Sequence, residues 1–198
     1  MAATQAPYGL RAVNELGGLP YAGSTRQFLI DPAGTTANIY NGTVVAVGTT
    51  GYIAPVTTVG SQADPFPAGV VGVFVGCSYI NAQGQVIYAQ YYPTGTTGVV
   101  TAYVIDDDRT VFQAQAAGSL AQTALGANVY FNAAQTGSTS TGNSTTALST
   151  TLGTNAAIAF KVVGFVQGPF STVGDAATDV LVKFNIGSHA YNTGTGVA

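Results

Sequence analysis

Short runs of β-branched and aromatic residues, each bounded by Gly, Pro or Asn, recur along most of this 198-residue chain. Such runs are typical of β-strands, and their boundaries are typical of turns. A strand-and-turn pattern repeated this often predicts an all-β fold. The expected strands lie at 26–30, 38–47, 51–59, 69–80, 84–92, 98–105, 110–116, 127–131, 159–168 and 178–186.

Three segments between the expected strands have other patterns. Residues 118–126 have apolar residues at helical spacing, with Ser119 as a candidate N-cap and Gly126 as a candidate C-cap. They predict one short helix that plugs one end of a barrel or sandwich. Residues 81–84 (NAQG) predict a hairpin loop. The Ser/Thr-rich stretch 133–157 fits a linker by its low complexity, but we favour a hairpin excursion within the same domain.

The two ends of the chain lack the strand pattern. Residues 1–25 are rich in Ala, Gly and Pro and have no sustained periodicity, so we expect an extended N-terminal arm. Residues 187–198 predict a flexible C-terminal tail, with His189 in a solvent-exposed position. Residues 26–186 then form a single β-rich domain.

Charged side chains are scarce, at 7% of the residues, where an ordinary soluble domain has roughly 25%. Since interspersed charge usually keeps a free monomer soluble, we expect other protein to cover much of the surface. Exposed Thr, Ser, Asn and Gln are the alternative source of solubility. A net charge of −3 argues against nucleic acid as a partner. The apolar runs are too short to cross a membrane, and the N-terminus has no secretory signal pattern.

Residues able to do chemistry are few: the chain has one cysteine, Cys77, one histidine and one glutamate. It has no Cys-x-x-Cys, no Gly-x-Ser-x-Gly, no P-loop and no dinucleotide-binding fingerprint. We therefore predict that the chain is not an enzyme and has no catalytic, cofactor or metal site. Cys77 lies in an apolar run and is expected to be a small buried side chain.

The densest charge lies in the block DDDR, at 106–109. Neighbouring side chains of an extended chain point to opposite faces, so three adjacent aspartates do not easily converge on one ion. A cation shared between symmetry copies stays open as the alternative. We interpret the block as the turn between two strands, where Asp accepts backbone hydrogen bonds. Its four residues, Asp106, Asp107, Asp108 and Arg109, are also candidates for salt bridges between subunits.

The N-terminal arm provides a second candidate interface, because Tyr and Arg are favoured interface anchors. The candidate residues in the arm are Pro7, Tyr8, Leu10 and Arg11. They would lie across a neighbouring subunit, although Tyr8 could equally fill a local core.

Several segments follow one another in a distinctive order. They are APYGLRAV and GLPYAGSTRQFLI, then GVFVGCSY and YYPTGTTG, then YVIDDDRTVFQAQAAGSLAQTALGANVYF and finally KVVGFVQGPFSTVGDAATDVLVKFNIG. Over most of its length the chain thus resembles capsid decoration (cement) proteins of tailed bacteriophages. The resemblance implies a β-barrel or jelly-roll-like sandwich. It also implies a homotrimer on the outer capsid surface of the virion, assembled in the host cytoplasm, that clamps adjacent major capsid proteins.

The resulting prediction is a non-enzymatic virion protein that decorates and stabilises the capsid. Another structural component of the phage particle, such as a tail or fibre protein, is the main alternative. A carbohydrate-binding module is a second, because the eleven tyrosines could stack on sugars, although tyrosines also pack within sheets. A bacterial surface or pilus subunit is a third, against which the missing export signal counts.

Overall fold

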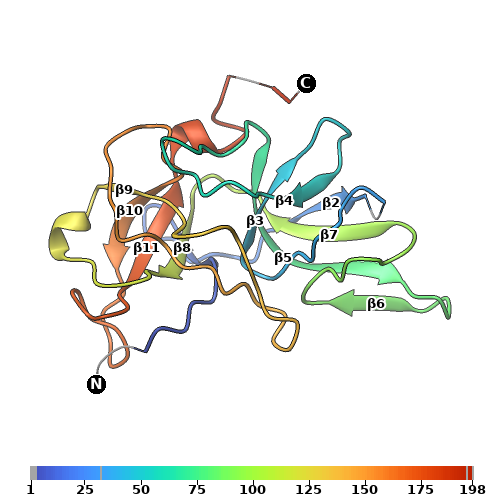
Figure 1. Ribbon diagram of the computed structural model, residues 1–198, viewed down its shortest axis with the longest axis horizontal. Helices are drawn as coiled ribbons and strands as arrows, with labels where there is room; N and C mark the ends of the chain where they lie inside the picture. Colours follow the sequence, from blue (N-terminus) through green and yellow to red (C-terminus); the bar gives the residue numbers. More distant parts are fainter. Residues whose placement is uncertain (1–3, 32, 195, 198) are drawn as a thin grey trace.

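The computed structural model describes residues 4–31, 33–194 and 196–197 (Figure 1). It confirms the predicted all-β class: 38% of the chain is strand and 3% is helix. In chain order, the strands are β1 (Arg11–Glu15), β2 (Arg26–Ile30), β3 (Thr43–Val47), β4 (Ile53–Pro55), β5 (Val70–Ile80), β6 (Val86–Ala89), β7 (Val100–Ile105), β8 (Thr110–Gln115), β9 (Asn128–Val129), β10 (Phe160–Phe165) and β11 (Asp179–Phe184). Among the described residues, no helix has the length and apolar character that crossing a membrane requires.

Five strands close into a barrel in the order β3-β4-β2-β7-β5, with β5 returning to β3. The long strand β5 also carries β6 on its outer side as a hairpin partner. To follow the barrel wall, β5 bends where its ladders to β3 and β7 shift register, near Gly72 and Gly76. At Gly72, with φ +146°, a Cβ atom would collide with the carbonyl oxygen of Ile105, so the site requires glycine.

The second sheet has the order β1-β8-β11-β10-β9 and lies against one side of the barrel (Figure 1). Neighbouring residues of the barrel strands supply two different cores. Val44 of β3 and Val73 of β5 face the second sheet, whereas Val45 and Phe74 fill the barrel interior. This alternation follows from the two-residue period of a strand, and it explains why β3 and β5 are apolar at successive positions.

Aromatic rings fill the space between the barrel and the second sheet. Phe160 of β10 packs edge-on against Phe66 and Phe131, with ring centroids 5.5 and 5.1 Å apart. Phe112 of β8 and Phe184 of β11 meet at 5.8 Å. Edge-to-face pairs of this kind stabilise a core beyond the apolar area that they bury.

The helix expected over 118–126 is reduced to a single 3-10 turn, η1 (Gln122–Ala124). The Ser119 hydroxyl does not cap this turn but donates to the carbonyl oxygen of Gly174. Leu120 and Ala124 are buried in the core between the sheets. Because a short helix gains little from its own hydrogen bonds, the packing of these two side chains decides the local conformation.

Both expected hairpins are present. In the 81–84 loop, the Gly84 amide donates to the carbonyl oxygen of Asn81 at 3.0 Å. The Ser/Thr-rich stretch forms a second hairpin around a bridge between Gly137 and Ser144. This second hairpin is not an exposed excursion, because Ser144 is fully buried and Leu148 lies in the core.

The ends of the chain differ most from expectation. Within the segment expected to be an arm, Arg11–Glu15 forms β1 and Leu10 is 1% exposed in the main core. Residues 186–188 form a 3-10 turn, η2 (Ile186–Ser188), and His189 behind it is completely buried. The predicted exposure of His189 is therefore wrong. The arm, domain and tail boundaries themselves stay predictions.

Candidate functional site

The block Asp106–Arg109 lies between β7 and β8, where a turn was predicted. Asp107 stabilises the turn: one carboxylate oxygen accepts from the Arg109 amide at 2.9 Å, and the other accepts from the Thr110 hydroxyl at 3.3 Å. Such bonds are the local reason why Asp is favoured at turns. Asp107 thus has a structural role within its own loop.

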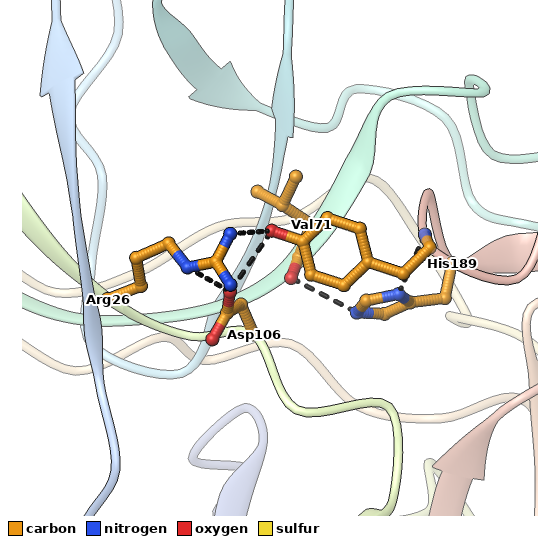
Figure 2. Close-up of polar contacts among 5 residues, drawn as sticks. Arg26, Val71, Asp106 and His189 are labelled. Atoms are coloured by element: carbon orange, nitrogen blue, oxygen red, sulfur yellow. Dashed lines mark hydrogen bonds and ion pairs between the residues drawn. The ribbon is translucent and has the colours of Figure 1, made fainter. Parts of the chain in front are cut away.

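Asp106 points back from this turn toward the barrel and the C-terminal segment (Figure 2). Its carboxylate pairs with Nε of Arg26, on β2, at 2.8 Å and accepts from the hydroxyl of Tyr191 at 3.0 Å. The Tyr191 hydroxyl in turn accepts from Nη1 of Arg26 at 2.7 Å. These three side chains join a strand, a turn and the chain end, which are far apart in the sequence.

His189 lies deeper in the same region and has both ring nitrogens engaged (Figure 2). Its Nε2 is 3.1 Å from the carbonyl oxygen of Val71, and its Nδ1 accepts from the Tyr191 amide at 3.3 Å. Because a carbonyl only accepts, Nε2 must carry the proton, and the ring is held as one neutral tautomer. Burial lowers the pKa of His189, an effect that the nearby aspartates 106–108 oppose.

Asp108 completes this group of contacts by accepting from the side-chain amide of Asn192 at 2.9 Å. We name the set Arg26, Asp106, Asp108, His189, Tyr191 and Asn192 the polar seam. It fastens the C-terminal segment to the barrel, and Arg109 is left exposed at its side. All three predicted interface aspartates thus have partners within the same chain.

The N-terminal candidates form a second polar group. The Tyr8 hydroxyl donates to the carboxylate of Asp179 at 3.1 Å, and the Arg11 guanidinium lies 4.4 Å from the centre of the Tyr8 ring. Burial is the main cause that raises the pKa of both Tyr8 and Asp179. Pro7 is half-buried beside them, and Leu10 lies in the core. Tyr8 and Leu10 therefore make contacts within the chain, while Arg11 remains exposed.

Neither group has the layout of a catalytic or metal site. Among the described residues, no three His, Cys, Asp or Glu side chains gather as metal ligands would. His189 is enclosed and both its nitrogens are engaged, so it has no free nitrogen to exchange a proton with a substrate. Burial raises the pKa of the Cys77 thiol to about 12, which keeps it protonated and unreactive.

An exposed apolar surface was not foreseen from the sequence. On the β5–β6 hairpin, Ile80, Val86 and Tyr88 are 59%, 60% and 77% exposed. At the nearby end of the barrel, a cavity of about 540 Å³ is lined mainly by apolar residues such as Leu29 and Val99. The absence of charge from Pro65 to Ile105 was the available signal, but it did not reveal which side chains face outward.

A second exposed surface follows β1 and the turn after it. Val13, Leu16 and Leu19 are 45%, 42% and 60% exposed there. The Leu16 amide donates to the carbonyl oxygen of Arg109, which places this surface beside the 106–109 turn. We name Arg11, Val13, Leu16, Leu19 and Arg109 the β1 surface.

Comparison of the chain with protein-family models, with curated proteins and with solved structures finds no significant match.

Proposed function

We propose that this chain is a virion structural protein that decorates the outer capsid surface of a tailed bacteriophage. It stabilises the capsid by clamping adjacent major capsid proteins, and the form expected on the capsid is a homotrimer. The single observation that carries the proposal is the β1 surface, where exposed apolar side chains stand between two exposed arginines. Arg and apolar side chains with few other charges are the usual composition of a protein–protein contact.

The remainder of the structure is consistent with a passive binding role. Two hydrophobic cores fill the interior, and the polar groups around Asp106 and Tyr8 hold the chain ends. A rigid body of this kind loses little conformational entropy when it docks. Many copies bound to one shell would add their modest individual contacts together, because dissociation of one copy leaves the others in place.

Some residues of the predicted interface have partners within the chain, so we propose the β1 surface as the contact in their place. Tyr8, Leu10 and Asp106 have partners inside the chain, whereas Arg11 and Arg109 remain available at the surface. We therefore assign the capsid contact to the two arginines and to the exposed apolar residues between them.

Labelling of purified phage particles that carry this chain tests the proposal. An antibody against the chain should mark the outer surface of the head in electron micrographs. Label on the tail would instead support a tail or fibre component, and absence from the particle would end the virion proposal. Binding of the isolated protein to a glycan array would favour the carbohydrate-binding alternative.

Retention on the capsid tests the assigned surface. Leu16→Asp should weaken retention about tenfold or more, since it places a charge where an apolar contact is expected. Phe170→Asp is the control, because Phe170 is 78% exposed but lies outside the β1 surface. Equal retention of both variants would remove the β1 surface from the proposal.

A further inference from the structure

Strand β6 is an open sheet edge. It pairs with β5 on one side, and no ladder or backbone hydrogen bond meets its other side among the described residues. Figure 1 shows β6 at the end of the molecule farthest from the second sheet. Its sequence, VIYA, contains no charge and no proline, two features that natural proteins place on edge strands to prevent pairing with another chain.

The edges of the second sheet are protected in ways that β6 is not. Strand β1 carries Arg11 and Glu15, has a register shift between Ala12 and Asn14, and is covered in part by a bridge from Asn14 to Pro20. At the other edge, Asn128 of β9 forms an antiparallel bridge with Gly153, which covers that side of the strand. Of the edge strands in the described part of the chain, β6 is therefore the one open to pairing.

The hairpin geometry shows which backbone groups of β6 are free. The Asn81 amide donates to the carbonyl oxygen of Gln85 at 2.9 Å, so these two residues form a hydrogen-bonded pair. In an antiparallel ladder such pairs recur at every second residue, which makes Ile87 the next one on β6. The amides and carbonyls of Val86 and Tyr88 consequently point away from β5, toward solvent.

The same two residues have the exposed side chains. Val86 and Tyr88 lie on one face of the hairpin, since they are two residues apart on a strand. Ile80, the neighbour of Val86 across the ladder, extends the apolar face onto β5. An occupant of this edge must therefore supply both an extended backbone and apolar side chains.

We propose that the occupant is a second copy of this chain, whose β6 pairs antiparallel with β6 across a two-fold axis centred on Ile87. In this register the outward backbone groups of Val86 and Tyr88 bond with those of Tyr88 and Val86 in the second copy. Four backbone hydrogen bonds would cross the contact, two for each of these hydrogen-bonded pairs. Each Val then lies beside a Tyr, a β-branched and aromatic pairing that stabilises sheets.

The features of the edge favour a second copy over another partner. Free donors and acceptors at positions symmetric about Ile87 are satisfied by an identical edge, as in an isologous two-fold contact. No charge lies between Pro65 and Ile105, so the contact brings no like charges of this region together. The β1 surface belongs to the other sheet, so this inference does not depend on the proposed function and is compatible with trimers joined in pairs.

Sedimentation equilibrium of the full chain tests the contact. The wild-type mass should show a two-fold association that depends on concentration. Tyr88→Lys should raise its dissociation constant about tenfold or more, because the change acts twice in a symmetric dimer. Phe170→Lys is the matched control, since Phe170 is 78% exposed and Tyr88 is 77% exposed.

Disulfide trapping tests the register. Ile87→Cys should form a dimer under mild oxidation, because facing residues of a non-hydrogen-bonded pair have Cα atoms about 4.5 Å apart. Val86→Cys should not form a dimer, because each Val86 lies opposite Tyr88 of the second copy. The Cα atoms of the two Val86 residues are then more than about 7 Å apart. The native Cys77 is buried in both variants.

Three results would overturn the contact. They are a wild-type chain that stays monomeric across the concentration series, an equal effect of Tyr88→Lys and Phe170→Lys, and equal trapping at positions 86 and 87. If Ile87→Cys does not fold, the lysine variants still decide the outcome.

Discussion

The N-terminal segment 4–16 and the C-terminal segment 186–194 flank the strand-rich body and attach to it through different contacts. The N-terminal segment joins the second sheet through the β1–β8 ladder and places Leu10 in the main core. The C-terminal segment makes few backbone bonds to the barrel, among them Ala190 to Val70 at 2.7 Å. It is held mainly by His189 and Tyr191.

This difference has consequences for tolerance to mutation. Ladder hydrogen bonds use backbone groups, so most side chains of β1 can change without loss of the contact. The polar seam depends on particular side chains, and each loses its partners when it is replaced. We therefore expect sensitivity to be concentrated at Leu10 in the first segment and distributed over the polar seam in the second.

The largest effect is expected for Leu10→Ala. It removes a side chain that is 1% exposed and leaves a cavity, at a cost of about 2 to 5 kcal/mol in the free energy of unfolding. Urea denaturation measures this cost, with Val13→Ala, at an exposed position of β1, as a control near zero. A small effect of Leu10→Ala would mean that the N-terminal segment is an arm, as the sequence suggested.

An intermediate effect is expected for His189→Gln, at about 1 to 3 kcal/mol, because the ring contacts with Phe184 and Tyr191 are lost. The pH dependence is the sharper measurement. The pKa of His189 is lowered in the folded state, so the unfolded chain binds the proton first as pH falls below 6.5. Wild-type stability should therefore fall relative to the Gln variant between pH 7 and pH 5.

The N-terminal group should respond to acid in the opposite direction. Burial raises the pKa of Asp179 above 3.8, so the folded chain takes up that proton first as pH falls. Relative to Asp179→Asn, the wild type should become more stable as pH falls through the folded pKa of Asp179 toward 3.8. Denaturation curves that show the same sign at both sites would contradict the assigned protonation states.

The smallest effects are expected for the two tyrosine hydroxyls. Tyr8→Phe should cost about 1 kcal/mol, because the hydroxyl bonds to a half-buried carboxylate. Tyr191→Phe should cost only about 0.5 kcal/mol, since Tyr191 is 49% exposed and water can replace its hydroxyl toward Asp106. Thermal melts of both variants show which substitution costs more stability. A larger loss of stability for Tyr191→Phe would mean that the polar seam is less accessible to water.

Local features of the fold were predictable because the residues involved are neighbours in the chain. The ten expected strand regions each contain a strand, although several strands are shorter than expected. The 81–84 hairpin loop and the turn at Asp106–Arg109 follow from Asn, Gly and Asp at fixed positions. The burial of Cys77 follows from the apolar run around it.

The candidate site was predictable only in part. The sequence marked Asp106, Asp108 and Tyr8 as interface candidates because of their charge or residue type. It did not predict their partners within the chain. The exposed apolar residues on β6 were missed, because period-2 alternation gives two equivalent faces until the sheet is packed.

The sequence by itself determined that this protein is all-β, where most strands and turns lie, and that charge is scarce. Only the tertiary structure decided that five strands close into a barrel, that Leu10 and His189 are buried, and that Asp106 meets Arg26 and Tyr191. The physical reason is the range of the interactions. Turn and strand preferences act between neighbours, whereas burial and ion pairing join residues about 80 positions apart, whose meeting depends on how the whole chain packs.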